Sequence, residues 1–380
     1  MKEIYFDNAS TALPVYSDTD DRFGNPSTTH ALGIRAYNEL NQAKKDLCKV
    51  LGCEKDELVF TSGGTESNNL AIIGYAIKHR RNNVRFYSLP WAHPSVTQTM
   101  KHVEALGFGN CHAGSGFTLS ILNSPSTTAW ASTIPTDFAE GINFISLPQI
   151  CHETGDRYDV AEISHAIKKQ NPKNIIHIDG VQGFCKEKIN LKNIDLYSFS
   201  GHKIHAPSGT GGLYVKKGVK LSALLYGGGQ EMGLRAGTEN TNGVADLCRA
   251  AKRLYENKDL IHHEVSDVKA ELQRLTDELE FVYVNSTRET SPYILNMSFS
   301  GVKGEVLVNM LSEKGIYVST GAACKTSKKE VPALVLMGFS KERADSAIRF
   351  GFSHANTAHE AKHVRSAIVE CVKMLRNLRR

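Results

Sequence analysis

The sequence predicts an α/β fold: a large domain with a mainly parallel sheet flanked by helices, plus a smaller α+β domain. Three observations indicate this. Short apolar runs alternate with stretches of helical periodicity, as in a sheet that is buried on both faces. After about residue 240 this rhythm changes to two long helical stretches. The length of 380 residues suits two or three structural units around a sizeable core.

The predicted strands of the large domain are short, apolar and bounded by turn residues. They cover residues 58–61, 84–89, 143–147, 174–179, 195–199 and 212–215. The helices expected between them cover residues 65–79, a stretch after Pro94, and residues 160–169. Residues 107–140 are rich in Gly, Ser and Thr with weak periodicity, so no element is assigned there.

The elements expected after residue 240 indicate a connector and a second domain. They are helices over 242–257, 259–279, 304–314 and 358–377, and strands over 281–284 and 293–297. We expect the large domain to cover residues 15–255. Residues 1–14 and 256–380 are expected to form the smaller domain.

Composition excludes several classes of protein. With 45 Lys and Arg against 40 Asp and Glu, the net charge of +5 is too mild to predict direct binding of nucleic acid. The longest apolar stretches, such as residues 331–337, are far shorter than the ~20 residues of a membrane span. The N-terminus lacks the apolar core of a secretory signal. We therefore expect no membrane association.

The eight cysteines are scattered, with no CxxC pair among them. A disulfide framework belongs to short secreted chains, and a zinc site requires closer spacing. We therefore expect reduced thiols in a cytoplasmic protein, and no metal site. P-loop and GxGxxG motifs are also missing, which argues against ATPases and dinucleotide dehydrogenases.

The segment from Ser62 to Thr65, Ser-Gly-Gly-Thr, ends one predicted strand and opens a helix. Glycines let a ligand approach the backbone, and a helix N-terminus offers free N–H groups to a phosphate. An ordinary strand-to-helix turn would have the same sequence, so this motif alone leaves both interpretations open.

A lysine, Lys203, follows the strand at 195–199 within Ser200-Gly201-His202-Lys203. Such a lysine can form a Schiff base while neighbouring hydroxyls hold a phosphate. Most lysines are simply solvated, but Asp179 closes a strand upstream and Gln182 follows it. A buried Asp can keep a pyridinium nitrogen protonated, although Asp179 could also only form the turn before the next glycine.

Together these motifs resemble the cysteine desulfurases, pyridoxal-phosphate enzymes of the class V aminotransferase-like group with fold type I. The resemblance covers most of the chain in ordered motifs. They lie at residues 7–11, 23–27, 61–69, 177–182, 198–203, 227–231, 235–238, 319–324 and 348–350.

The resemblance implies pyridoxal 5′-phosphate as cofactor and Lys203 as its Schiff-base residue. It implies that Asp179 pairs with the pyridine nitrogen, that Gln182 binds the ring oxygen, and that His93 stacks on the ring and moves protons. Histidine suits both tasks of His93, since it is flat and titrates near neutrality. The residues implied to hold the phosphate are Gly64, Thr65, Ser200 and His202, with Thr238 from the second subunit of a homodimer.

The resemblance also implies the reaction, conversion of L-cysteine to L-alanine. Cys324, in a polar loop at about 318–332, would carry the sulfur as a persulfide. The lysines beside it favour the thiolate modestly. Asn8 and Arg349 would bind the substrate, the guanidinium fork of Arg349 holding the α-carboxylate. A sulfur-acceptor protein, such as an iron–sulfur scaffold or a tRNA-thiolation enzyme, would be a partner.

One departure from the family pattern concerns His152, which stands where relatives have an Asn that contacts the cofactor or substrate. An imidazole can still donate a hydrogen bond to the ring oxygen, but it is bulkier and can be charged. This leaves two alternatives open. The chain could act on another amino acid, such as selenocysteine, or be an inactive scaffold relative.

Overall fold

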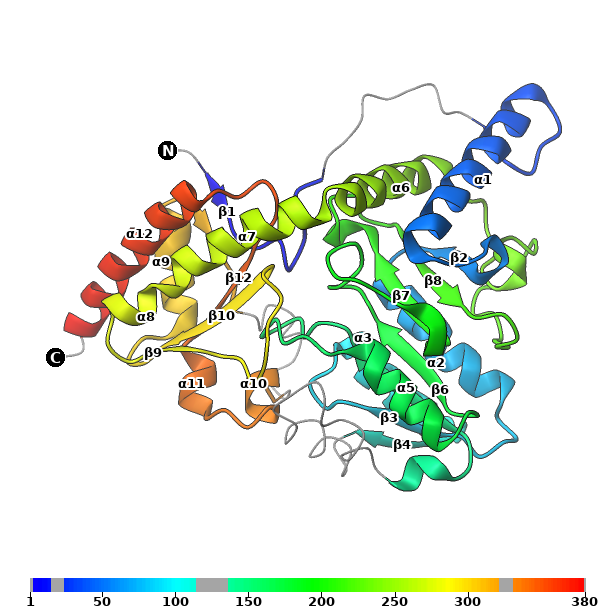
Figure 1. The fold of residues 1–380 in the computed structure, drawn as a ribbon, viewed down its shortest axis with the longest axis horizontal. Coiled ribbons are helices and arrows are strands. Elements are labelled where there is room, and N and C mark those ends of the chain that lie inside the picture. The colour runs from blue at the N-terminus through cyan, green and yellow to red at the C-terminus, as the bar shows by residue number, and fades with distance from the viewer. Residues whose placement is uncertain (1–2, 15–23, 114–135, 321–330, 379–380) are drawn as a thin grey trace. The chain divides into compact units, whose positions relative to one another are not determined.

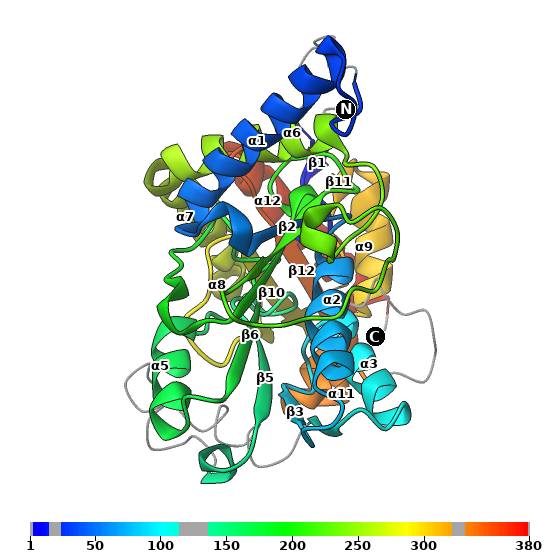
Figure 2. The same ribbon diagram turned by 90° about the vertical axis from the view of Figure 1, so that its right-hand side faces the viewer.

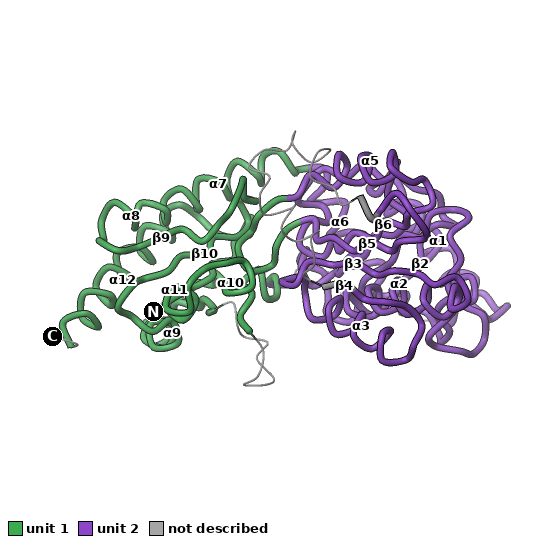
Figure 3. The backbone as a smooth tube through the Cα atoms, turned by 90° about the horizontal axis from the view of Figure 1, so that it is seen from below, with its two compact units in different colours: residues 1–12, 150–157, 257–380 green, residues 13–149, 158–256 purple. Residues whose placement is uncertain are grey.

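A computed structural model describes residues 3–14, 24–113, 136–320 and 331–378 of the chain (Figure 1). The chain folds into two compact units (Figure 3). Unit 1 contains residues 1–12, 150–157 and 257–380, and unit 2 contains residues 13–149 and 158–256. Among the described residues, no helix combines the length and apolar character that crossing a membrane requires.

Unit 2 is built on a seven-stranded sheet with the order β2-β8-β7-β6-β5-β3-β4. All neighbouring pairs are parallel except the two that β8 makes, which are antiparallel. The strands are β2 (Leu58–Thr61), β3 (Arg85–Ser88), β4 (Asn110–Ala113), β5 (Asn143–Pro148), β6 (Ile175–Asp179), β7 (Leu196–Ser200) and β8 (Gly211–Val215). The predicted fold class is therefore confirmed.

Helices cover both faces of this sheet, which is why its central strands β5, β6 and β7 are buried almost throughout. Figure 2 shows α2 (Gly64–Lys78) and α3 (Pro94–Ala105) on one face and α5 (Val160–Gln170) on the opposite face. Two further helices, α1 (Ala31–Leu51) and α6 (Thr241–Glu256), pack against each other.

Unit 1 contains a three-stranded antiparallel sheet with the order β12-β10-β9 and a separate pair of short parallel strands. Helices α7 and α12 lie side by side in this unit (Figure 1). The strands are β1 (Ile4–Tyr5), β9 (Val282–Val284), β10 (Ile294–Phe299), β11 (Ile316–Tyr317) and β12 (Ala347–Gly351). The helices are α7 (Lys258–Gln273), α8 (Leu275–Glu278), α9 (Gly304–Glu313), α10 (Ala333–Leu336), α11 (Lys341–Asp345) and α12 (Ala358–Asn377).

The predicted strands and helices of both regions are confirmed, with boundaries shifted by a few residues, except that the helix expected over 259–279 is divided at Arg274 into α7 and α8. In the unassigned segment 107–140, the structure contains β4 and a 3-10 turn at Thr136–Ala139. The 21-residue helix α1 was not predicted. Its buried face is partly built of Gly33, Ala36 and Ala43, which give a weak hydrophobic signal.

Candidate active site

Polar residues of unit 2 gather at the carboxyl ends of neighbouring strands. Thr61, Asp179 and Ser200 are the last residues of β2, β6 and β7. Thr61 and Ser200 both pair with Gly211 of β8, which lies between them. Ligands of open α/β sheets bind at this edge, outside the carboxyl ends of the strands.

The backbone at the N-terminus of α2 leaves space for an anion to come close. Its N-cap, Gly63, has a φ of 151° and provides no side-chain cap. A Cβ on Gly64 would come within 2.4 Å of Val181 Cγ2, and one on Gly63 within 3.4 Å of Ser200 Oγ. Since the first N–H groups of a helix have no acceptor within it, these groups and the Ser200 hydroxyl can bind a phosphate.

The carboxylate of Asp179 accepts hydrogen bonds on both oxygens. Oδ1 accepts from the backbone N–H of Val181 at 3.1 Å, and Oδ2 accepts from the side-chain amide of Asn68 at 3.0 Å. Asp179 is buried. These donors hold the carboxylate in one orientation, and a carboxylate so placed can accept a hydrogen bond from a protonated ring nitrogen.

A cluster of basic side chains follows β7. His202 and Lys203 lie in the short turn Gly201–Lys203. Burial lowers the pKa of His202 to about 4, with further contributions from the positive charges of Lys203, Lys186 and His93. His202 is therefore neutral at pH 7, and can both donate and accept hydrogen bonds. Lys186 is itself buried, and burial lowers its pKa to about 8.

His93 is the N-cap of α3. Its Nδ1 accepts a hydrogen bond of 3.2 Å from the backbone N–H of Ser95 and lies 2.7 Å from the Ser95 hydroxyl. Pro94 occupies the first helical position, where its missing N–H costs nothing. The local sequence therefore fixes the imidazole at the start of this helix.

The other predicted cofactor residues of unit 2 differ in exposure. Gln182 is buried in the turn after Asp179. Thr65 and Thr238 are exposed. Thr238 can therefore be reached by another molecule.

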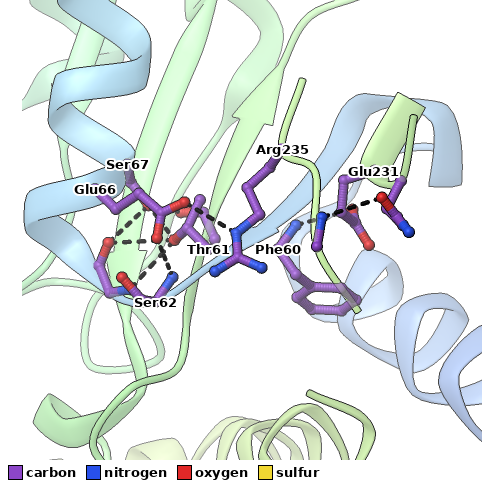
Figure 4. A network of polar contacts seen from close by, with 11 residues as sticks. Phe60, Thr61, Ser62, Glu66, Ser67, Glu231 and Arg235 are labelled. Carbon is purple, nitrogen blue, oxygen red and sulfur yellow. Dashed lines mark hydrogen bonds and ion pairs between the residues drawn. The ribbon is translucent and has the colours of Figure 1, made fainter. Parts of the chain in front are cut away.

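The loop that precedes Thr238 is tied to the start of α2 and to β2 (Figure 4). Arg235 Nε donates to Glu66 Oε1 at 3.1 Å, and Glu66 Oε2 accepts from the backbone N–H of Ser62 at 2.7 Å. In the same loop, Glu231 accepts from the backbone N–H of Phe60 at 3.0 Å. Glu231 is also ion-paired with Lys44 at 3.0 Å.

In unit 1, Arg349 lies on β12 and is 5% exposed. Its Nη1 donates to the backbone carbonyl of His152 at 2.9 Å, and its Nη2 donates to the hydroxyl of Ser10 at 2.7 Å. The carboxylates of Asp7 and Glu153 lie 3.5 and 3.9 Å from these nitrogens. The guanidinium is thus held in one orientation among oxygen atoms.

Asn8 and His152 flank this arginine through different contacts. The Asn8 amide donates to the carbonyls of Tyr5 and Gly351 and to the side chain of Asn356, while Asn8 Oδ1 is buried without a hydrogen bond among the described residues. The His152 imidazole Nε2 lies 3.6 Å from Glu153 Oε1. Unit 1 therefore brings together Asn8, His152 and Arg349, three of the predicted site residues.

Cys324 lies outside the described residues. The seven cysteines within them are all free thiols. Burial raises the pKa of Cys111 to about 12, of Cys151 to about 11 and of Cys248 to about 11. These three thiols are thus poor nucleophiles at neutral pH.

Sequence reasoning missed several residues that the structure places at the strand edge. Asn68 contacts Asp179, Ser95 contacts His93, and Lys186 acts on His202. The only available signals were the position of Asn68 one turn into α2 and that of Ser95 in the first turn of α3. Neither position predicts a tertiary contact.

Comparisons of the sequence and of the structure with known proteins indicate the same group of relatives. The model of the family "Aminotransferase class-V" matches residues 4–364. The "Cysteine desulfurase IscS" of Buchnera aphidicola subsp. Schizaphis graminum is 34% identical over 399 residues, covering 99% of this chain and 94% of that protein.

Two solved structures are similar along nearly the whole chain. One, described as "NIFS-LIKE PROTEIN", has a TM-score of 0.84 at 28% identity and covers 98% of this chain and 100% of its own. The other, "SspA in complex with cysteine", has a TM-score of 0.74 at 27% identity, with 93% and 99% covered.

Proposed function

Since the chain belongs to the class-V aminotransferase family, and within it to the cysteine desulfurases, we propose that it converts L-cysteine to L-alanine with the sulfur held on Cys324. One observation carries the proposal. An uncapped helix N-terminus, a buried carboxylate and a lysine in a basic turn all follow the carboxyl ends of neighbouring strands. An anionic cofactor with a basic ring nitrogen and an aldehyde would match all three.

The residues at this edge fit pyridoxal 5′-phosphate. Gly63 and Gly64 leave room for a phosphate beside Ser200. A Cβ on Gly64 would clash with Val181. Asp179, as an acceptor at a strand end, suits the ring nitrogen. The residues that would hold the cofactor are Gly64, Thr65, Ser200 and His202 at the phosphate, Asp179 at the nitrogen, Gln182 and His152 at the ring oxygen, Lys203 as covalent anchor, and Thr238 from a second subunit.

When bound, this cofactor supplies an electron sink that makes the Cα–H of an amino acid acidic. The side chains of the protein do the rest. Arg349 would hold the α-carboxylate of cysteine, with Asn8 supporting the segment beside it. The amine of Lys203 or the imidazole of His93 would accept the Cα proton, and a proton would then be returned to carbon.

Cys324 would take the sulfur. Its thiolate attacks the sulfur of the substrate, an S–S bond forms, and the Cβ–S bond of the substrate breaks. A protein thiol and cysteine thus become a protein persulfide and alanine, with every atom accounted for. Transfer of the outer sulfur to a thiol of an acceptor protein, such as an iron–sulfur scaffold or a tRNA-thiolation enzyme, would regenerate Cys324.

We propose a homodimer in the cytoplasm for the working protein. Thr238 is exposed, and the loop before it carries exposed apolar side chains, with Tyr226 80% and Met232 48% exposed. Exposed apolar residues that gather beside a candidate site favour a protein interface. A reducing compartment also suits free thiols and a persulfide carrier.

The test is to purify the protein with added pyridoxal 5′-phosphate, record its visible absorbance, and measure alanine and sulfide from L-cysteine with a thiol reductant. We expect a yellow protein that forms alanine and sulfide in equal amounts. Cys324→Ser should retain the colour and lose the activity. Cys53→Ser, at a half-buried cysteine that has no proposed role, should keep both.

Two outcomes would overturn the proposal. A yellow protein that ignores cysteine but acts on selenocysteine would indicate a lyase of different substrate choice. A protein that takes up no cofactor would indicate a scaffold relative.

A further inference from the structure

A continuous series of hydrogen bonds connects His93 with Asp179 through two side chains that the proposed mechanism does not use. His93 Nδ1 lies 2.7 Å from Ser95 Oγ, Ser95 Oγ lies 2.9 Å from Asn68 Nδ2, and Asn68 Nδ2 lies 3.0 Å from Asp179 Oδ2. Asn68 is 1% exposed and Ser95 is 8% exposed. The series therefore lies inside unit 2, where water competes little for these bonds.

The amide of Asn68 sets the direction of the hydrogen bonds. An ionised carboxylate can only accept, so the NH2 group of Asn68, and not its oxygen, must face Asp179. The same NH2 group faces Ser95 Oγ, to which it donates its second hydrogen. The proton of the Ser95 hydroxyl is then left to be donated to the imidazole of His93.

The backbone leads to the same result for His93. The N–H of Ser95 points at His93 Nδ1 at 3.2 Å, which leaves no room for a proton on that nitrogen. His93 Nδ1 therefore accepts from two donors, the hydroxyl and the backbone N–H of one residue. A neutral imidazole with an acceptor at Nδ1 must carry its proton on Nε2.

We infer that Asn68 and Ser95 are positioning residues that hold His93 as the Nε2–H tautomer while keeping Asp179 an acceptor. The inference rests on the proposed function for the roles of His93 and Asp179. The Asn68 amide thus donates to Asp179 and, through Ser95, keeps the proton of the neutral His93 imidazole on Nε2. Proton transfer by His93 then begins with donation from Nε2, so acceptance of the Cα proton falls to the amine of Lys203.

The same contacts also affect the charge of His93. Hydrogen bonds donated to Nδ1 stabilise the neutral imidazole and therefore lower its pKa. His93 and His202 also repel each other when both are charged, which acts in the same direction. Removing the Ser95 hydroxyl should weaken only the first of these effects, because His202 and the backbone N–H of Ser95 remain.

The experiment is NMR of the protein loaded with pyridoxal 5′-phosphate and labelled with 15N in its histidine rings. Two-bond couplings identify which nitrogen of each ring is protonated, and His93→Asn assigns one signal among the 15 histidines. We expect a protonated Nε2 and an unprotonated Nδ1 between pH 6 and 8. Ser95→Ala should raise the pKa of His93 by about one unit or mix the tautomers, whereas Ser95→Thr should preserve both properties.

Asn68→Ala should release the other end of the series. We expect the pH titration of the visible absorbance of the bound cofactor to shift, since Asp179 loses a donor. Asn69→Ala is the matched control, because the Asn69 amide donates to the carbonyl of Thr65 in its own helix. In steady-state assays, kcat and its pH profile should change in Ser95→Ala, with KM for cysteine nearly unchanged.

Two results would overturn the inference. One is a protonated Nδ1 on His93 in the unaltered protein. The other is a Ser95→Ala protein that folds but keeps both the tautomer and the pKa of His93. The NMR measurement does not depend on turnover. A protein that fails to use cysteine would therefore overturn the proposed function, whereas the protonation of the His93 ring nitrogens would still decide this inference. Should Ser95→Ala not fold, the tautomer in the unaltered protein and in Ser95→Thr decides the inference.

Discussion

Arg235 and Glu66 form an ion pair of 3.1 Å that ties the loop before Thr238 to the first turn of α2. Both side chains are half-buried, and Glu66 also closes the turn at Ser62. Burial by itself would raise the pKa of Glu66, but hydrogen bonds from Ser62 and Arg235 outweigh it and hold the pKa below its usual value. The ion pair thus connects two segments to which we assign phosphate contacts.

We predict that Glu66→Gln lowers the stability of the fold in a pH-dependent manner. A carboxyl whose pKa is lower in the folded protein stabilises the fold above its unfolded pKa of about 4.3, and this contribution is lost as the pH falls through the folded value. Glu66→Gln should therefore unfold at a lower temperature than the unaltered protein at pH 7, and the two melting temperatures should converge as the pH falls through the folded pKa of Glu66. Equal melting temperatures at pH 7 would show that the pair contributes nothing.

Gly64→Ala should impair cofactor binding through a clash that a second substitution relieves. The new Cβ would lie 2.4 Å from Val181 Cγ2, closer than real Cβ atoms approach. Overpacking of this kind costs about 1–3 kcal/mol, so we expect the dissociation constant for pyridoxal 5′-phosphate to rise about ten- to hundredfold. Val181→Ala in the same chain should recover most of the loss. A double variant no better than Gly64→Ala would contradict the steric explanation.

The large sheet could be predicted from sequence because its strands are short, apolar and separated by clear helices. The candidate site in unit 2 followed for the same reason, since Asp179 and Ser200 close predicted strands and Gly64 opens a predicted helix. Residues at the carboxyl ends of parallel strands in one sheet lie at the same edge, so their proximity can be predicted from the strands alone.

Other features depend on contacts that periodicity does not encode. Residues 150–157 belong to unit 1 although both flanking segments belong to unit 2, and nothing in their composition indicates this. Likewise, Asn68 and Ser95 are ordinary polar residues on two helices. Only the packing of α2 against α3 brings them to 2.9 Å from each other.

Replacing Arg349 by Lys should weaken the binding of cysteine more than it slows the chemical step. A lysine keeps the charge but cannot present two parallel N–H groups to a carboxylate. We expect KM for cysteine to rise about ten- to hundredfold with a smaller change in kcat. Arg343→Lys is the control in the same unit, because Arg343 donates to Asn285 and to the carbonyl of Val284. An equal rise in KM for both variants would argue against a specific role for Arg349.

The buried imidazole of His177 should make the protein lose stability in mild acid. His177 is fully buried in β6, with Nδ1 2.8 Å from the Ser146 hydroxyl and Nε2 2.9 Å from the Ser198 hydroxyl. Burial lowers the pKa of His177 to about 3. Unfolded histidine has a pKa of about 6.5, so between these values the unfolded chain binds a proton that the folded chain does not. The free energy of unfolding therefore falls with falling pH, by up to about 1.4 kcal/mol per pH unit from this residue.

His177→Gln should flatten this dependence. A glutamine side chain can hydrogen-bond to one or both hydroxyls but does not titrate, so we expect a loss of about 1–3 kcal/mol at pH 7 and a shallower fall between pH 6 and 4. Urea unfolding followed by circular dichroism at several pH values measures both quantities. His263→Gln, at an exposed histidine of α7, should leave the pH dependence as it is. If His177→Gln has the same slope as the unaltered protein, the acid sensitivity originates in other groups, since a neutral amide cannot take up the proton that the unfolded imidazole binds.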